Sequence, residues 1–312
     1  MQENTKQPEV LFLGRTTLDA LYWLDRLPEE DTKCYAGKFH AAVGGPAANA
    51  ALTHAMLGGQ SYLITSLGQG MWADAARGEF RRHGVQVADL AKETAFETPL
   101  VTVLVSAENS SRTCINPPLH TACFPVLDAA WEKAVPETWG AMPAVALTDG
   151  FHLAETLPLL ATLHEHGAAI CLDGGSWKPG TEKLAPLLRT AICSERFQTP
   201  REFGGASGPE AVLQWFAAQG VREVAITRGP RSILGREAGR SFEIEIEAID
   251  AADTLGAGDV LHGAWSFFRA RGLNFEAALR KAAQVATESC KTLGIDGWNR
   301  KLQAETAQGL RC

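Results

Sequence analysis

The chain has 312 residues, of which 46% are hydrophobic and 21% charged, and its net charge is -7 at pH 7. This length is ample for one large α/β domain with a sizeable core. The negative charge comes without a basic patch, which argues against nucleic acid as a partner. Residues 1–8 are polar and no 18 consecutive residues are apolar. We therefore expect no secretory signal, no membrane span and a cytoplasmic protein.

The cysteines and histidines do not form a metal-binding pattern. Seven cysteines occur without a C-x-x-C pair, and an odd number cannot all pair within one chain, so we expect reduced thiols. His164 and His166 flank Glu165, but residues i and i+2 do not share a helical face. This histidine pair is better interpreted as a solvated helix end.

In chain order, apolar or β-branched runs alternate with amphipathic stretches, which is typical of a parallel sheet covered by helices on both faces. The expected strands are residues 10–13, 61–65, 144–147, 168–172, 191–193 and 223–227. The expected helices are residues 47–57, 72–83, 155–166, 209–219, 257–271 and 275–292. A glycine follows five of these helices, as expected where the chain leaves a helix with positive φ: Gly58, Gly84, Gly167, Gly220 and Gly272.

Two segments interrupt this alternation. Residues 18–43 and 98–116 resemble β-ribbons without intervening helices, and 100–106 alternate in polarity before a polar turn. Open α/β sheets bind ligands at the carboxyl ends of their strands, so a small sheet standing over that edge would form a lid. We expect a single domain over residues 1–312, with a lid formed by about 18–43 and 98–116.

The most informative motif is Asp253-Thr-Leu-Gly-Ala-Gly-Asp259, which runs into an apolar stretch. Gly256 and Gly258 lack Cβ atoms, so the turn can bring several N–H groups close to an oxyanion, and the following helix adds its positive N-terminal dipole. Asp259 would lie in the first helical turn, where its carboxylate could accept a proton from an attacking hydroxyl. We interpret the segment as a kinase catalytic loop rather than as a helix-capping turn.

A second group of residues could hold a polyol. Gly44 and Gly45 precede an alanine-rich helix and let the backbone approach a ligand, while Asn49, one turn into that helix, offers both a donor and an acceptor. Asp19 follows the first strand, and its carboxylate can accept hydrogen bonds from two hydroxyls. Each residue alone fits a turn or a helix start, but their occurrence with the C-terminal loop favours a sugar site.

At this point the chain resembles the PfkB/ribokinase family of carbohydrate kinases over nearly its whole length, through Gly44-Gly-x-x-x-Asn49 and Asp253-Thr-x-Gly-Ala-Gly-Asp259. The resemblance implies a three-layer α/β/α sandwich with a β lid, and transfer of the γ-phosphoryl group of ATP to a sugar hydroxyl with Mg²⁺. A monovalent cation and a homodimer through the lid are compatible with it. The implied roles are a catalytic base for Asp259, an anion hole for Gly256, Ala257 and Gly258, sugar contacts for Asp19, Gly44, Gly45 and Asn49, and nucleotide contacts for Thr227, Gly229, Thr254, Gly256 and Gly258.

The family's metal motif departs from its usual form. Ser194 stands in the place of the usual asparagine, and Glu195 follows it. Mg²⁺ keeps several waters and needs few protein ligands, so Glu195 could still orient a hydrated ion.

Two branches of the family share further features with the chain. Residues 285–290 and 294–297 resemble the ketohexokinase branch, which carries a lid arginine where Arg112 falls. Lys33, Asn116 and residues 172–174 instead resemble sulfofructose kinase, which implies an anionic substituent on the sugar. The sequence therefore predicts a kinase for a ketose or an anionic sugar.

Two other functions remain open on the sequence alone. A nucleoside or vitamin kinase of the same fold needs an aromatic platform, which Tyr22, Trp23 and Phe39 in the expected lid could supply. A sugar sensor that has lost catalysis is the other alternative, although Asp259 and the glycine loop argue against it.

Overall fold

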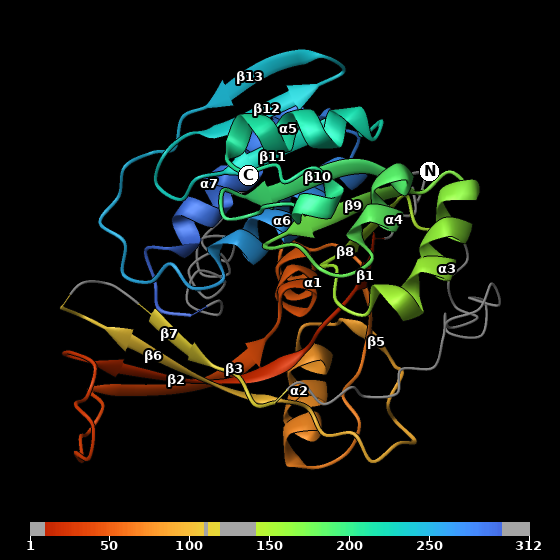
Figure 1. Cartoon of the computed structure of the whole chain (residues 1–312). Helices are drawn as coiled ribbons and strands as arrows, with labels where there is room; N and C mark the ends of the chain where they lie inside the picture. The colour runs from red at the N-terminus through yellow and green to blue at the C-terminus, as the bar shows by residue number, and fades with distance from the viewer. Residues whose placement is uncertain (1–9, 109–111, 119–141, 295–312) are drawn as a thin grey trace, which may run out of the picture.

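The computed structural model describes residues 10–108, 112–118 and 142–294. These residues form a nine-stranded sheet with helices around it and a separate four-stranded sheet that extends away from it (Figure 1). Within the described residues no helix is both long enough and apolar enough to cross a membrane.

The large sheet has the order β13-β12-β11-β10-β9-β8-β1-β4-β5. Seven of its strands run parallel: β1 Val10–Leu13, β4 Ser61–Thr65, β5 Gln86–Asp89, β8 Val145–Thr148, β9 Ala169–Gly174, β10 Leu188–Ser194 and β11 Glu223–Thr227. At one edge β12 Ile233–Glu237 and β13 Arg240–Ile244 add an antiparallel hairpin. The six strands expected from the sequence are confirmed to within a few residues, whereas β5, β12 and β13 were not anticipated.

Helices cover both faces of this sheet, because successive residues of a buried strand point to opposite sides. Val10 and Phe12 of β1 pack in one core with α1 Pro46–Met56, α2 Met71–Arg82, α6 Ala257–Ala270 and α7 Phe275–Ser289. Leu11 and Leu13 pack in a second core with α3 Leu153–Glu165, α4 Thr181–Leu184 and α5 Pro209–Ala218. The result is the expected three-layer α/β/α arrangement, and the six predicted helices are all present.

The small sheet contains β2 Thr17–Leu24, β3 Lys38–Gly44, β6 Leu100–Ser106 and β7 Arg112–Ile115, in the order β3-β2-β6-β7. Strands β2 and β6 pair in parallel, whereas the two outer pairs are antiparallel. The two expected ribbons thus meet in one sheet. Leu255, from the glycine loop, packs against the cluster of Leu21, Val101 and Val103 on this sheet, so the small sheet contacts the loop directly.

Candidate active site

The glycine loop and the start of α6 present Asp259. Gly256 precedes the helix with a φ of 73°, a left-handed conformation that favours glycine, and Asp259 lies in the first turn. The loop is held by Asp253, whose Oδ1 accepts a hydrogen bond from Leu255 N at 2.9 Å and whose Oδ2 accepts one from Gly294 N at 3.2 Å. The first N–H groups of α6 have no partner within the helix, which suits an anion.

Asn49 and Asp259 are brought together by a close contact between α1 and α6. A Cβ atom at Gly263 would lie 2.3 Å from Ala50 O, so the glycine is what allows the two helices to approach. Asn49 Nδ2 donates a hydrogen bond to Asp259 Oδ2 at 2.7 Å. Asn49 Oδ1 is buried and has no hydrogen-bond partner among the described residues. An acceptor is thereby left for a ligand hydroxyl.

The environment of Asp259 raises the pKa of its carboxyl group toward neutral pH. Burial raises its pKa to about 7, and the nearby charges of Asp173 and Asp149 also raise it. The hydrogen bond from Asn49 and the charge of His262 act in the opposite direction. A carboxyl group that titrates near 7 is suited to act as a general base under physiological conditions.

Asp19 faces the same space. Its carboxylate accepts a hydrogen bond from Thr17 Oγ1 at 2.7 Å, and burial raises its pKa. A Cβ at Gly44 would lie 2.1 Å from Asp19 Oδ2, and one at Gly45, where φ is 98°, would lie 2.2 Å from Arg15 O. Both glycines therefore allow other parts of the protein, Asp19 and Arg15, to come close, and no larger residue would fit without a shift, whereas the approach of a ligand to them stays a prediction.

These residues surround one cavity, which we call the first cavity, with a volume of about 100 Å³. It is lined by Asp19, Leu21, His40, Ala42, Val43, Gly45, Pro46, Asn49, Leu255, Gly256, Asp259 and Gly294. Carboxylate and amide groups from both ends of the chain thus converge on a small enclosed space. The aromatic residues Tyr22, Trp23 and Phe39 are absent from this lining.

Two buried aspartates beside the site were missed at the sequence level. Asp173 ends β9, and its Oδ2 is 3.3 Å from His262 Nδ1 but has no hydrogen bond, since that nitrogen is 2.8 Å from Gly258 O. Burial raises the pKa of Asp173, against the charges of His262 and Lys178. Asp173 belongs to the segment 172–174 that resembles sulfofructose kinase, but the sequence analysis gave it no role of its own.

Asp149, which follows β8, is the other missed aspartate. Its Oδ2 accepts hydrogen bonds from Arg15 N at 2.9 Å and Ala47 N at 3.2 Å, and its Oδ1 accepts one from Phe151 N at 2.9 Å. Burial raises its pKa to about 7. Asp149 therefore connects the chain after β1, the start of α1 and the chain after β8 through hydrogen bonds to their backbone N atoms.

The other predicted sugar contacts lie farther out. Lys33 is exposed in the segment between β2 and β3 and lines neither this cavity nor any other described here. Arg112 on β7 is also exposed, and its Nη1 donates to Thr254 Oγ1 at 3.3 Å, so it reaches the glycine loop. Asn116 accepts a hydrogen bond at its Oδ1 from Arg15 Nη2 at 3.4 Å.

The residues predicted to contact nucleotide and metal lie at the ends of β10 and β11. Thr227 Oγ1 donates to Cys193 O at 3.3 Å, and Gly229 has a φ of 63° in the turn after β11. Glu195 forms an ion pair with Arg231, and its side chain is 37% exposed. The carboxylate of Glu195 is therefore already paired with a cation, in contrast to Asp173.

Comparison with known proteins finds relatives over nearly the whole chain. A model of the pfkB family carbohydrate kinases matches residues 7–299. Ketohexokinase of Mus musculus is 26% identical over 94% of this chain and 99% of its own, and ribokinase of Bacillus subtilis strain 168 is 21% identical over 92% and 94%. The structure of Arabidopsis thaliana ribokinase complexed with ribose and ATP superposes with a TM-score of 0.71 at 19% identity, covering 96% of this chain and 98% of that one.

The fold is ribokinase-like, and the carbohydrate kinases that the chain matches are phosphotransferases that act on sugar hydroxyls. The chain belongs to the pfkB family of carbohydrate kinases.

Proposed function

We propose that the protein transfers the γ-phosphoryl group of ATP to a hydroxyl of a small sugar, either a ketose or an anionic sugar derivative. The observation that carries the proposal is the shared lining of the first cavity, where Asp259, Asn49 and Asp19 meet. The side-chain oxygens of these three residues are hydrogen-bond acceptors, and they match the hydroxyl donors of a polyol. Tyr22, Trp23 and Phe39, the aromatic platform that the sequence suggested for a nucleoside, do not line this cavity, which favours a sugar.

In the proposed mechanism Asp259 accepts the proton of the attacking hydroxyl. General-base catalysis of this kind typically contributes about 10²–10⁴-fold in rate. Asn49 holds one oxygen of Asp259 through its amide and offers its own Oδ1 to a second hydroxyl of the sugar. Asp19 would bind further hydroxyls from the small sheet, so that the reacting oxygen is held in a fixed position.

The N–H groups of Gly256, Ala257 and Gly258 would stabilise the charge that develops on the transferred phosphoryl group. Thr227, Gly229 and Thr254 remain our candidates for nucleotide contacts. Arg112 and Leu255 connect the small sheet to the loop. Closure of this sheet as a lid would exclude water and so suppress hydrolysis of ATP.

The residues present also fit a hydrated Mg²⁺. No group of three or more His, Cys, Asp or Glu side chains in the described parts of the chain could enclose a metal, but Mg²⁺ is usually bound through one or two carboxylates and substrate phosphates. Asp173 Oδ2, buried without a hydrogen bond, would hold it through water, with Glu195 as the alternative predicted from the sequence. When bound, Mg²⁺ neutralises charge on the phosphates of ATP.

The test is an ADP-release screen of the purified protein with ATP and Mg²⁺ against free ketoses, aldoses, sugar phosphates, sulfofructose and nucleosides. We expect ADP release that depends on a sugar. Release with a nucleoside alone would establish the nucleoside kinase alternative. Sugar binding by calorimetry without ADP release would show a sensor and contradict the proposal.

A further inference from the structure

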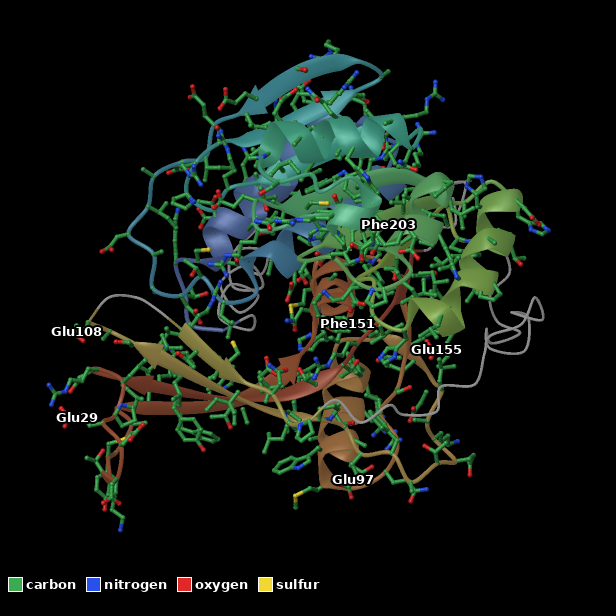
Figure 2. The ribbon with its side chains drawn as sticks, in the orientation of Figure 1. Glu29, Glu97, Glu108, Phe151, Glu155 and Phe203 are labelled. Atoms are coloured by element: carbon green, nitrogen blue, oxygen red, sulfur yellow. The ribbon has the colours of Figure 1, made fainter. Side chains whose placement is uncertain are left out.

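A second cavity, of about 280 Å³, lies next to the first and has no role in the mechanism above. Its walls come from the ends of β1, β4 and β8, the start of α2, and residues 96–100, which lead into β6. The lining includes the aromatic residues Trp72, Phe96 and Phe151, together with one acid, Glu97, and one arginine, Arg15. Figure 2 shows Phe151 at the level where the large sheet meets the small one. Pockets for small ligands usually combine such apolar walls with a few polar groups.

The two cavities share a wall. The backbone of Arg15 and Thr16 lines the second cavity and touches Gly45, which lines the first: a Cβ at Gly45 would lie 2.2 Å from Arg15 O and 3.1 Å from Thr16 Cα. On the small sheet, Asp19 faces the first cavity, while Leu100, the register partner of Leu18, lines the second. The second cavity therefore adjoins the first.

Arg15 supplies the positive charge at this wall. Its guanidinium carbon lies 5.4 Å from the centre of the Phe151 ring, and its Nη2 is 3.4 Å from Asn116 Oδ1. Among the described residues no ion pair joins the guanidinium to a carboxylate within 4.0 Å, and the nearby Asp149 accepts its hydrogen bond from the backbone N of Arg15. Burial lowers the pKa of Arg15, while the charges of Asp149 and Asp19 raise it. The guanidinium is thus partly desolvated, and within the part of the chain that the structure describes its hydrogen bond is to Asn116 Oδ1, which leaves other N–H donors for a ligand.

A second polar group in the wall lacks a partner. Ser66 is 4% exposed, lines the second cavity, and its Oγ has no hydrogen bond within the part of the chain that the structure describes. Buried hydroxyl groups are normally paired, so an unpaired one beside a cavity is a further sign of a ligand.

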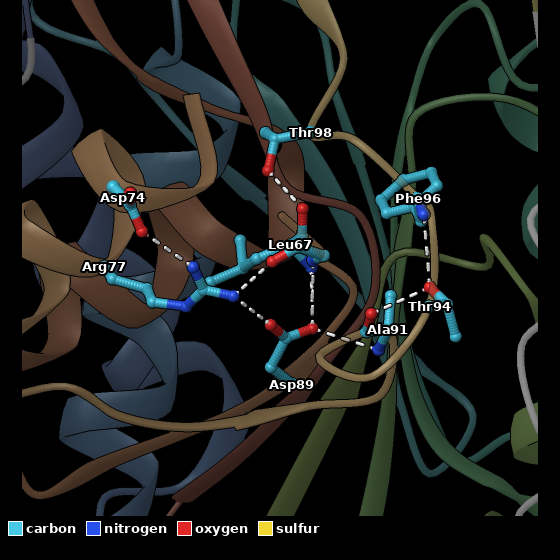
Figure 3. A network of polar contacts seen from close by, with 9 residues as sticks. Leu67, Asp74, Arg77, Asp89, Ala91, Thr94, Phe96 and Thr98 are labelled. Atoms are coloured by element: carbon cyan, nitrogen blue, oxygen red, sulfur yellow. Dashed lines mark hydrogen bonds and ion pairs between the residues drawn. The ribbon is translucent and has the colours of Figure 1, made fainter. Parts of the chain in front are cut away.

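A polar network holds the segments that carry Phe96 and Thr98, which line the second cavity (Figure 3). Asp89 Oδ1 accepts hydrogen bonds from the backbone N atoms of Leu67, Gly68 and Ala91 at 2.9, 3.3 and 3.0 Å, and its Oδ2 pairs with Arg77 at 2.7 Å. Thr98 Oγ1 donates to Leu67 O at 2.7 Å. The network fixes the segments on either side of Ser66 and Phe96, so the cavity is preformed.

We propose that the second cavity binds an anionic substituent of the sugar, a carboxylate, phosphate or sulfonate remote from the reacting hydroxyl, and that Arg15 is its receptor. Guanidinium groups bind such oxyanions through paired hydrogen bonds. Phe151 and Asn116 hold the guanidinium in position, and the aromatic walls cover the carbon atoms that connect the anion to the sugar. This inference rests on the proposed function, since it assigns the substrate class of the same kinase site.

The test compares each acid sugar with its neutral partner: fructose 6-phosphate and sulfofructose with fructose, and glucuronate with glucose. The kcat/KM for each is measured by ADP release in the wild type, in Arg15→Met and in Arg222→Met. Arg222 is an exposed arginine just before β11, a strand separated from β1 by β10, β9 and β8, and serves as the matched control. Calorimetry of the same sugars with Asp259→Asn measures binding without turnover.

We expect at least one acid sugar to be preferred over its neutral partner, and Arg15→Met to reduce that preference by about tenfold or more, as loss of a charge-assisted contact does. Arg222→Met should leave the preference unchanged. Equal use of neutral and acid sugars, or the same preference in Arg15→Met as in the wild type, would overturn the anion site while leaving the kinase intact. Binding of acid sugars without ADP release would instead support the anion site and contradict the kinase. If calorimetry detects binding of no sugar, both fail.

Discussion

The variant Asp259→Asn tests the proposed base in a way that follows from its pKa. A general base acts as the carboxylate, and the pKa of Asp259 is raised to about 7, chiefly by burial and next by Asp173. About half of the protein should therefore be active at pH 7, roughly a tenth at pH 6 and roughly a hundredth at pH 5. An aspartate with an ordinary pKa near 3.8 would keep full activity down to about pH 5.

The measurement is kcat/KM for the best sugar between pH 5 and 9, with the affinity for ATP measured separately at each pH. We expect a tenfold fall for each unit below pH 7 in the wild type. Asp259→Asn keeps the shape of the side chain but cannot accept the proton, so its rate should be about 10²–10⁴-fold lower and nearly independent of pH. A flat wild-type profile from pH 5 to 7, or a variant with more than about a tenth of the wild-type rate, would refute the role of base.

Two glycine positions give further predictions. Gly44→Ala places a Cβ 2.1 Å from Asp19 Oδ2 and should raise the KM for the sugar about tenfold or more, because it displaces this carboxylate. The control is Gly37→Ala, whose Cβ has no contact closer than 3.7 Å and which should leave the KM unchanged. Equal KM values for the two variants would contradict a contact between Asp19 and the sugar. A Cβ at Gly258 would meet nothing within 4 Å, so Gly258→Ala should leave the melting temperature unchanged, as should the control Gly78→Ala in α2. Gly258→Ala should nevertheless abolish ADP release, because the added methyl group obstructs the phosphoryl group. An active Gly258→Ala enzyme would exclude this loop as the anion hole.

The sequence predicted the parallel core because its strands are short apolar runs and its helices have clear ends. It failed at the sheet edges. β5 Gln86–Asp89 is four residues long and only partly buried, so its composition does not distinguish it from a loop. The hairpin of β12 and β13 turns at Ala238 and Gly239 and carries charged residues on its exposed face, which weakens the strand pattern.

The residues of the site also fall into those that the sequence predicted and those that it did not. Asp259, Asn49 and Asp19 were found because each stands in or near a glycine pattern that constrains the backbone. Asp149 and Asp173 follow apolar strands with no such pattern, and only the neighbouring positions of β1, β8 and β9 in the sheet bring them to the site. Strand order depends on packing over the whole chain, so the sequence could not predict this cluster of acids.

The cost of this cluster leads to a last prediction, about stability. A carboxyl group whose pKa is raised in the folded state stabilises the fold below its unfolded pKa of about 3.8, and this contribution is lost as the pH rises to about 7. Asp259→Asn does not titrate, while Asp149 and Asp173 titrate in both proteins. The full rise of the Asp259 pKa, from 3.8 to about 7, corresponds to a change of about 4 kcal/mol in the free energy of unfolding. Partial exposure and interaction with Asp173 reduce the expected change to about 1–2 kcal/mol.

The melting temperature of Asp259→Asn relative to wild type should therefore increase between pH 5 and pH 8, by a few degrees for a chain of this size. Differential scanning fluorimetry at both pH values measures this difference, and the Gly78→Ala protein, altered far from the acids, should show no such trend. A variant that loses stability relative to wild type as the pH rises would mean that Asp259 is ionised at little cost in the folded protein. In the proposed mechanism the ionised form of Asp259 is the base. Burial of this charge therefore lowers the stability of the protein at the pH where the enzyme is active.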